Sequence, residues 1–143
     1  QVLEFNCRFG DPETQAMLPR LANDLAEGML AVAENRLASW TPIWRDEAAV
    51  CVVLAAGGYP GEYRKGLPMA GLAEAAATGA LVFHAGTARQ GQDLVTNGGR
   101  VLGVVGMGGD IAKAITHAYQ AVAEIRWDGM QYRRDIGHRA LQR

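Results

Sequence analysis

Apolar side chains recur at helical spacing in two parts of the chain. Members of each stripe stand three or four positions apart: Leu18, Leu21, Leu25, Met29 and Val32, then Ile111, Ile115, Ala118, Val122 and Ile125. This spacing places them on one face of a helix. The first helix is expected to begin at Pro12, with Asp11 as its N-cap and an adjustment near Pro19, and Asp110 is the expected N-cap of the second.

Short runs rich in β-branched residues predict strands along the chain. The candidates are residues 2–6, 48–55, 81–84, 94–96 and 101–105. Asn97-Gly98-Gly99 stands between the last two runs and predicts a tight hairpin. Residues 67–78 are rich in alanine and favour a short helix, and a helical tail is expected near residues 136–141.

The order of these elements indicates an α+β fold. Strands that cluster together and are flanked by helices, without alternating with them, are typical of that class. The stretch from residue 40 to residue 47 interrupts the regular elements with aromatic residues and a proline, and we place a domain boundary there. Residues 1–44 would then end one domain, and residues 45–143 would form a second, small and β-rich domain with flanking helices.

Composition narrows the class of protein. The chain has 143 residues, a hydrophobic fraction of 49% and a charged fraction of 20%, which fit a globular domain with its own core. A net charge of −1 argues against nucleic acid as a main partner. No apolar run approaches the roughly 20 residues that cross a bilayer. Cys7 and Cys51 lie in apolar runs and are expected to be buried, reduced thiols of a cytoplasmic protein.

The residues best suited to chemistry gather at the start of the chain. Side chains alternate faces along a strand, so Glu4 and Asn6 share a face and Arg8 follows at the same parity. A carboxylate beside an amide oxygen suits a hard cation such as Mg²⁺. A neighbouring guanidinium suits a phosphate or a carboxylate. The same pattern is compatible with the solvated face of an edge strand, so on its own it leaves both interpretations open.

The opening stretch also carries a family resemblance. Glu4-Phe5-Asn6, followed by Arg8-Phe9-Gly10-Asp11-Pro12-Glu13-Thr14-Gln15, resembles the motif of glycinamide ribonucleotide synthetases (phosphoribosylamine–glycine ligases), which belong to the ATP-grasp superfamily. Further segments resemble the C-terminal region of that family in the same order: residues 55–64, 82–87, 98–102 and 133–137. The similarity covers the whole chain, but only the last part of the family's much longer polypeptide.

The resemblance implies an ATP-dependent carboxylate–amine ligase of purine biosynthesis. In that family, ATP phosphorylates glycine to glycyl phosphate, and the amine of phosphoribosylamine then displaces the phosphate. The residues that match Glu4 and Asn6 bind Mg²⁺ or Mn²⁺ at the nucleotide phosphates, and Arg8 is implied as a catalytic and substrate-binding residue. The implied fold is the end of an ATP-grasp domain followed by a small domain packed on the ATP-grasp core. The implied partners are ATP, glycine, phosphoribosylamine and the upstream domains of the same protein.

Two further candidates have competing structural explanations. Asp11 suits either a helix cap or a substrate contact. The loop that contains Gly57, Gly58 and Tyr59 can line the substrate pocket, because glycines let a backbone approach a ligand closely. Glycine and proline also make ordinary turns, so the loop can equally serve packing between domains.

The chain begins without methionine, directly before an apolar run, and we expect it to be part of a longer protein and inactive alone. Its two lysines, Lys65 and Lys113, stand outside any nucleotide-binding motif. Two alternatives remain open. One is another ATP-grasp ligase or carboxylase whose substrate is not glycine, and the other is a stand-alone, non-catalytic interaction module.

Overall fold

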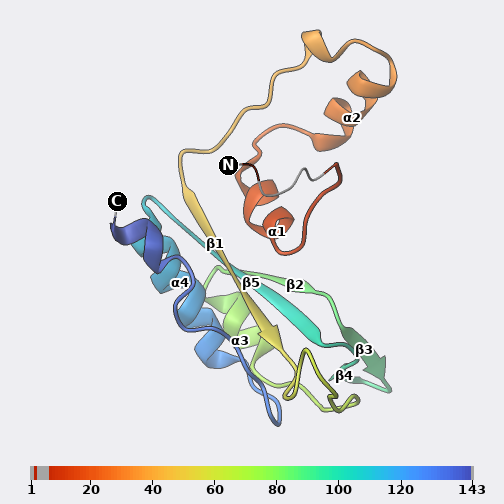
Figure 1. The fold of residues 1–143 in the computed structure, drawn as a ribbon, viewed down its shortest axis with the longest axis vertical. Coiled ribbons are helices and arrows are strands. Elements are labelled where there is room, and N and C mark those ends of the chain that lie inside the picture. The colour runs from red at the N-terminus through yellow and green to blue at the C-terminus, as the bar shows by residue number, and fades with distance from the viewer. Residues whose placement is uncertain (1, 3–6, 143) are drawn as a thin grey trace.

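The computed structural model describes residue 2 and residues 7–142 of the chain (Figure 1). The predicted strand at residues 2–6 lies outside the described residues, apart from Val2, which is exposed. The helices are α1 (Glu13–Met17), α2 (Leu25–Ala33), α3 (Leu72–Ala77) and α4 (Ile111–Glu124). The strands are β1 (Ala48–Ala55), β2 (Leu81–His84), β3 (Thr87–Gln90), β4 (Asp93–Thr96) and β5 (Arg100–Gly108). Short 3₁₀ helices span Leu18–Arg20, Leu37–Ser39 and His138–Gln142.

The strands form two antiparallel sheets. In the first, β5 lies between β1 and β2, with Val104 opposite Val52 on one side and Val82 on the other. In the second, β3 pairs with β4 across a turn at Gly91, where φ is +64°. β-branched residues at these positions pack well on a pleated surface. The expected α+β class is confirmed, because the strands pair with one another in antiparallel fashion and the helices flank them.

The hairpin predicted at Asn97-Gly98-Gly99 is wrong, because this segment connects the two sheets and does not pair β4 with β5. The Asn97 amide donates to the Gly86 carbonyl at 2.7 Å. A Cβ atom on Gly98 would lie 2.8 Å from the Cα of Gly86. The glycines therefore allow two backbone segments to pack directly against each other. This role requires the same residues as a tight turn, so the sequence alone does not distinguish the two.

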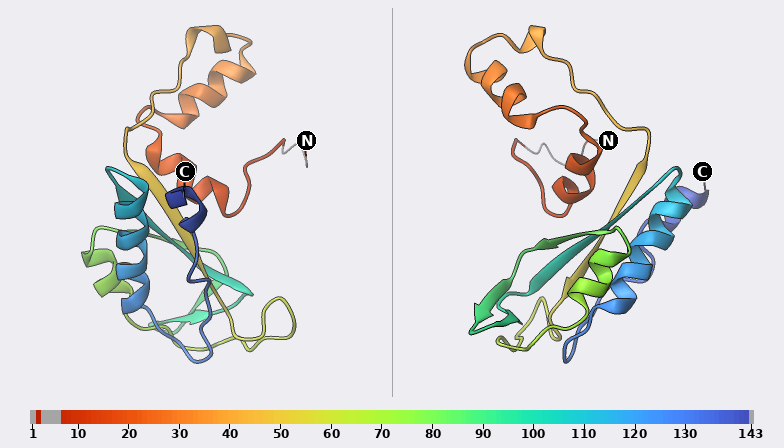
Figure 2. Two further views of the ribbon diagram at one scale, coloured as in Figure 1. Left: turned by 60° about the vertical axis from the view of Figure 1, so that its left-hand side comes forward. Right: turned by 180° about the vertical axis from the view of Figure 1, so that it is seen from behind.

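Helices α3 and α4 cover one face of the first sheet (Figure 2). Alternate side chains of β1 point into the core between the sheet and α4, namely Val50, Val52 and Leu54. The predicted apolar stripe of α4 faces them, with Ile115, Ala118, Val122 and Ile125 all buried. The carboxylate of Asp110 accepts a hydrogen bond from the Lys113 amide at 2.7 Å, so the predicted N-cap of α4 is confirmed.

The single helix expected from Pro12 through the apolar stripe to Val32 is wrong. Helix α1 ends at Met17, and Pro19, which has no N–H to donate, lies in the 3₁₀ helix that follows. Helix α2 begins again after Asp24, whose carboxylate caps it by accepting from the Ala26 amide at 2.7 Å. A proline and a local cap together override an apolar pattern that runs through both helices.

Two expectations drawn from composition can be compared with the structure. Neither cysteine forms a disulfide, and Cys51 is partly buried, but Cys7 is exposed, so the expectation that both are buried is wrong for Cys7. Burial, with a smaller contribution from the Asp11 carboxylate, raises the pKa of the Cys51 thiol to about 11, which keeps it protonated at neutral pH. Within residues 7–142, no helix is long and apolar enough to cross a membrane.

The contact between α4 and β5 is closer than side chains normally permit. A Cβ atom on Gly106 would lie 2.2 Å from the amide nitrogen of Ala118 and 2.5 Å from the carbonyl oxygen of Ala114. The helix backbone therefore rests directly on the backbone of the central strand. Gly106 is required there because any side chain would push α4 off the sheet.

We expect Gly106→Ala to lower the free energy of unfolding by about 1–3 kcal/mol or more, because α4 must move to admit the methyl group. Urea denaturation followed by circular dichroism measures this change. Gly109→Ala is the matched control, since a Cβ atom there has no neighbour within 4 Å. Equal losses of stability in the two variants would show that the close contact is not what Gly106 provides.

Candidate functional site

A groove of about 500 Å³ lies on the opposite face of β1 from the apolar core. Val53 and Ala55 of β1 line it, since side chains of a strand alternate between faces. The Tyr59-Pro60 turn and residues 131–133 also line it, together with Pro12 and Arg100. Segments from four separate parts of the chain therefore meet in one place.

Asp11 connects the N-terminal motif to this groove. Its carboxylate lies 3.1 Å from the guanidinium of Arg100, the first residue of β5. It also accepts a hydrogen bond from the side-chain amide of Gln15 at 2.9 Å. The predicted role of Asp11 as helix cap is wrong, because Pro12 occupies the N-cap position of α1 and no side chain caps that helix. The pair is about half exposed and adds little stability, so its main effect is to hold the Arg100 side chain in one direction.

In the Gly57-Gly58-Tyr59 loop, the two glycines serve backbone packing and a turn, and the tyrosine lines the groove. A Cβ atom on Gly57 would lie 2.6 Å from the carbonyl oxygen of Gly129, and Gly58 has a φ of +96°, so both glycines serve close packing and a turn. Tyr59 alone of the three lines the groove. Its ring covers Gly99, and its carbonyl accepts a hydrogen bond from the Gln131 side-chain amide at 2.8 Å.

Among the remaining candidates, only Arg8 lies within the described residues, and it does not line the groove. Glu4 and Asn6 lie outside the described residues. Arg8 is exposed, and its guanidinium donates to the Phe9 carbonyl at 3.1 Å. Residues 9–11 line a second, smaller cavity of about 360 Å³ against His84 at the end of β2. Within residues 7–142, no cluster of three or more His, Cys, Asp or Glu side chains is placed to hold a metal ion.

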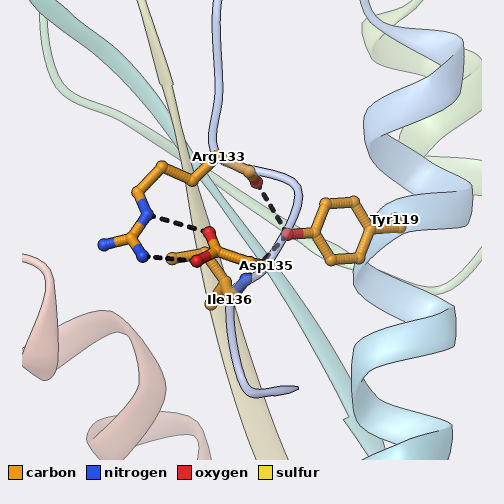
Figure 3. A network of polar contacts seen from close by, with 4 residues as sticks. All are labelled: Tyr119, Arg133, Asp135 and Ile136. Carbon is orange, nitrogen blue, oxygen red and sulfur yellow. Dashed lines mark hydrogen bonds and ion pairs between the residues drawn. The ribbon is translucent and has the colours of Figure 1, made fainter. Parts of the chain in front are cut away.

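A polar network holds the chain after α4 beside the groove (Figure 3). The hydroxyl of Tyr119 on α4 donates to the Arg133 carbonyl at 2.7 Å and accepts from the Ile136 amide at 3.1 Å. The Arg133 guanidinium donates twice to the Asp135 carboxylate, at 2.9 Å and 2.6 Å. These hydrogen bonds from Arg133 hold the pKa of Asp135 below its ordinary value of 3.8.

The sequence does not predict most residues of the groove as site candidates, and those with charged or amide side chains among them are Arg100, Gln131 and Arg133. Arg100 and Arg133 do fall within two of the segments that carry the family resemblance. The only local signals of a binding role are the charge of the two side chains, the glycines before Arg100 and the aspartate two positions after Arg133. Gln131 has no such signal, because its place depends on backbone pairing with Ala55, 76 positions earlier in the chain (131 − 55).

Comparisons with known proteins give a consistent result. A family profile described as "Phosphoribosylglycinamide synthetase, C domain" matches residues 49–139. The chain is 57% identical over 142 residues to the phosphoribosylamine–glycine ligase of Synechocystis sp., which covers 99% of this chain and 34% of that protein. It is 54% identical over 142 residues to the trifunctional purine biosynthetic protein adenosine-3 of Gallus gallus, covering 99% of this chain and 14% of that protein.

A solved structure agrees with the sequence comparisons. The crystal structure of phosphoribosylamine–glycine ligase from Thermotoga maritima superposes with a TM-score of 0.74 at 36% identity, covering 94% of this chain and 32% of that one. The resemblance inferred from the motifs is thus confirmed. The chain spans about a third of the length of the bacterial relatives that it matches.

We expect Tyr119→Phe to lower the free energy of unfolding by about 1–2 kcal/mol, because it removes one hydrogen-bond donor and acceptor that serve two backbone groups. Hydrogen exchange should show faster opening at the Ile136 amide. Tyr63→Phe is the control, since its hydroxyl makes no hydrogen bond to any residue within 7–142. An unchanged Ile136 exchange rate in Tyr119→Phe would contradict the network.

The Arg133–Asp135 pair should stabilise the protein in a pH-dependent way. Because the folded-state pKa of Asp135 is lowered, its contribution is complete above the ordinary value of 3.8 and is lost as pH falls through the lowered pKa. We therefore expect the stability difference between the wild-type protein and Asp135→Asn to be constant from pH 7 to pH 5 and to shrink at lower pH. Urea denaturation at a series of pH values measures it, and a difference that grows on acidification would contradict the assignment.

Proposed function

The chain belongs to the phosphoribosylglycinamide synthetase family, and on that premise we propose that it is the C-terminal part of an ATP-dependent ligase that joins glycine to 5-phosphoribosylamine in purine biosynthesis. The observation that carries this proposal is 57% identity over 99% of the chain to an enzyme named phosphoribosylamine–glycine ligase. Since the match covers 34% of that enzyme, the segment is expected to be inactive without the rest of the protein.

The reaction needs positioning and charge neutralisation more than a protein nucleophile. The carboxylate of glycine attacks the γ-phosphorus of ATP, releasing ADP and forming glycyl phosphate. The amine of phosphoribosylamine then attacks the acyl carbon, loses a proton and releases inorganic phosphate. The exposed guanidinium of Arg8 suits the binding of these anionic groups, and we assign it a catalytic and substrate-binding role.

Glu4 and Asn6 are the proposed ligands of the divalent cation. Their donor set, a carboxylate and an amide oxygen, fits Mg²⁺ or Mn²⁺, which prefer oxygen ligands. When bound, the ion neutralises charge on the nucleotide phosphates. Arg8 follows two positions later in the sequence, so the three side chains form one polar segment before α1.

Two observations support the proposed division of the chain into residues 1–44, the end of an ATP-grasp domain, and residues 45–143, the small C-terminal domain. The family profile begins at residue 49, near the proposed boundary. Met29, Leu30 and Val32 of α2 are 50–57% exposed, which is typical of a helix face that packs against another domain. We therefore propose that upstream domains of the same protein cover α2, and that the enzyme works in the cytoplasm.

The full-length protein that contains this chain tests the proposal. We expect Glu4→Gln combined with Asn6→Ala to lower the rate of glycine-dependent ADP formation on the order of 10²–10³-fold, similar to the loss of one preorganised electrostatic contact. Binding of Mn²⁺, followed by electron paramagnetic resonance, should weaken in the same variant. Glu47→Gln, at an exposed residue of the same chain, is the control.

Circular dichroism of the double variant should match the wild-type protein, because the proposed role of the two side chains is to bind the cation. Full turnover with unchanged Mn²⁺ binding would show that the cation is held elsewhere. No glycine-dependent ADP formation by the wild-type protein would remove the proposed function itself.

A further inference from the structure

The groove beside β1 has the size and lining of a small-molecule site. Its volume of about 500 Å³ lies within the usual range for ligand pockets. Val53 and Ala55 give it an apolar surface, and the Tyr59 ring adds an aromatic one. Polar groups from Arg100, Gln131 and Arg133 converge on the same space. An apolar surface with a few fixed polar groups is the arrangement that binds an amphipathic ligand such as a sugar phosphate.

The two arginines are held in place without using all their donors. A guanidinium has five N–H donors in a rigid fork. Arg100 presents Nη2 to Asp11, and Arg133 presents Nε and Nη2 to Asp135. Within residues 7–142, Nη1 of Arg133 has no hydrogen-bond partner. Each carboxylate thus orients one edge of a guanidinium and leaves another edge free for an anion.

We propose that this groove binds the phosphate end of a sugar phosphate through Arg100 and Arg133, with Tyr59 against the sugar. The inference rests on the proposed function, where the sugar phosphate is phosphoribosylamine. Asp11 and Asp135 are positioning residues for the two arginines. Tyr119 positions the backbone of the segment that carries Arg133.

Glycine, the other small molecule among the proposed substrates, is a zwitterion and fits the groove less well. Glycine has five heavy atoms and one carboxylate, which would leave most of a cavity of about 500 Å³ unfilled. A phosphate dianion uses two guanidinium groups, and a ribose ring uses the aromatic and apolar surface. The Asp11–Arg100 pair joins the groove to the N-terminal motif, since Asp11 belongs to the same motif as Arg8.

The test uses the full-length protein and the variants Arg100→Gln and Arg133→Gln. Calorimetric titration with ribose 5-phosphate gives a dissociation constant. Titration with ribose, which lacks the phosphate, is the control for binding of the sugar alone. We expect ribose 5-phosphate to bind about tenfold more weakly, or worse, in both variants, because each loses charged hydrogen bonds. The KM for phosphoribosylamine should rise by a similar factor, while the KM values for glycine and ATP stay within about twofold. Arg126→Gln, at an exposed arginine outside the groove, is the control for a general loss of positive charge.

Arg100→Lys and Arg133→Lys are the controls that separate loss of binding from misfolding. They keep the positive charge and are expected to weaken binding less than the glutamine variants. A KM for glycine that rises in place of the KM for phosphoribosylamine would overturn the assignment. So would equal affinity for ribose 5-phosphate in the wild-type, Arg100→Gln and Arg133→Gln proteins, or affinity for ribose equal to that for ribose 5-phosphate.

A separate result contradicts the proposed ligase function, namely that the wild-type protein forms no ADP in the presence of glycine. In that case the titrations with ribose 5-phosphate still decide whether the groove binds a sugar phosphate.

Discussion

The direct contact between the backbones of α4 and β5 determines how α4 packs on the sheet and how the surrounding segments are placed. Gly106 has no side chain to separate them, and α4 therefore lies close enough to bury Ala114 and Ala118 against the central strand. Burial of small side chains at short distance is what gives this thin, three-stranded sheet a core on one face. The same contact sets the distance between α4 and the sheet.

The groove on the other face is built outward from that contact. Tyr119 of α4 reaches the segment after the helix and sets the backbone of Arg133. Gln131 pairs with the end of β1 and reaches the Tyr59 carbonyl, and Arg100 begins the strand on which α4 rests. A displaced helix would therefore disturb the groove through the contact between Tyr119 and Arg133, which links packing to binding in this domain.

The parts of this structure that could be predicted are those set by local rules. The β1 strand, the β2 strand, the cap at Asp110 and the stripe of α4 follow from alternation, periodicity and capping. The hairpin predicted at Asn97-Gly98-Gly99 and the helix cap predicted at Asp11 are wrong, because glycine and aspartate each serve several local roles and tertiary contacts select among them. Tyr59 is found in the groove as one of the predicted alternatives, but Gln131 depends on long-range pairing that no local pattern encodes.

We infer that this C-terminal segment supplies the sugar-phosphate site of the proposed ligase. A crystal structure of the full-length protein with ribose 5-phosphate tests that claim most directly. We expect density for the ligand against Tyr59, with phosphate oxygens within hydrogen-bond distance of both the Arg100 and Arg133 guanidinium groups. Density for the ligand elsewhere in the protein, with this groove empty, would contradict it.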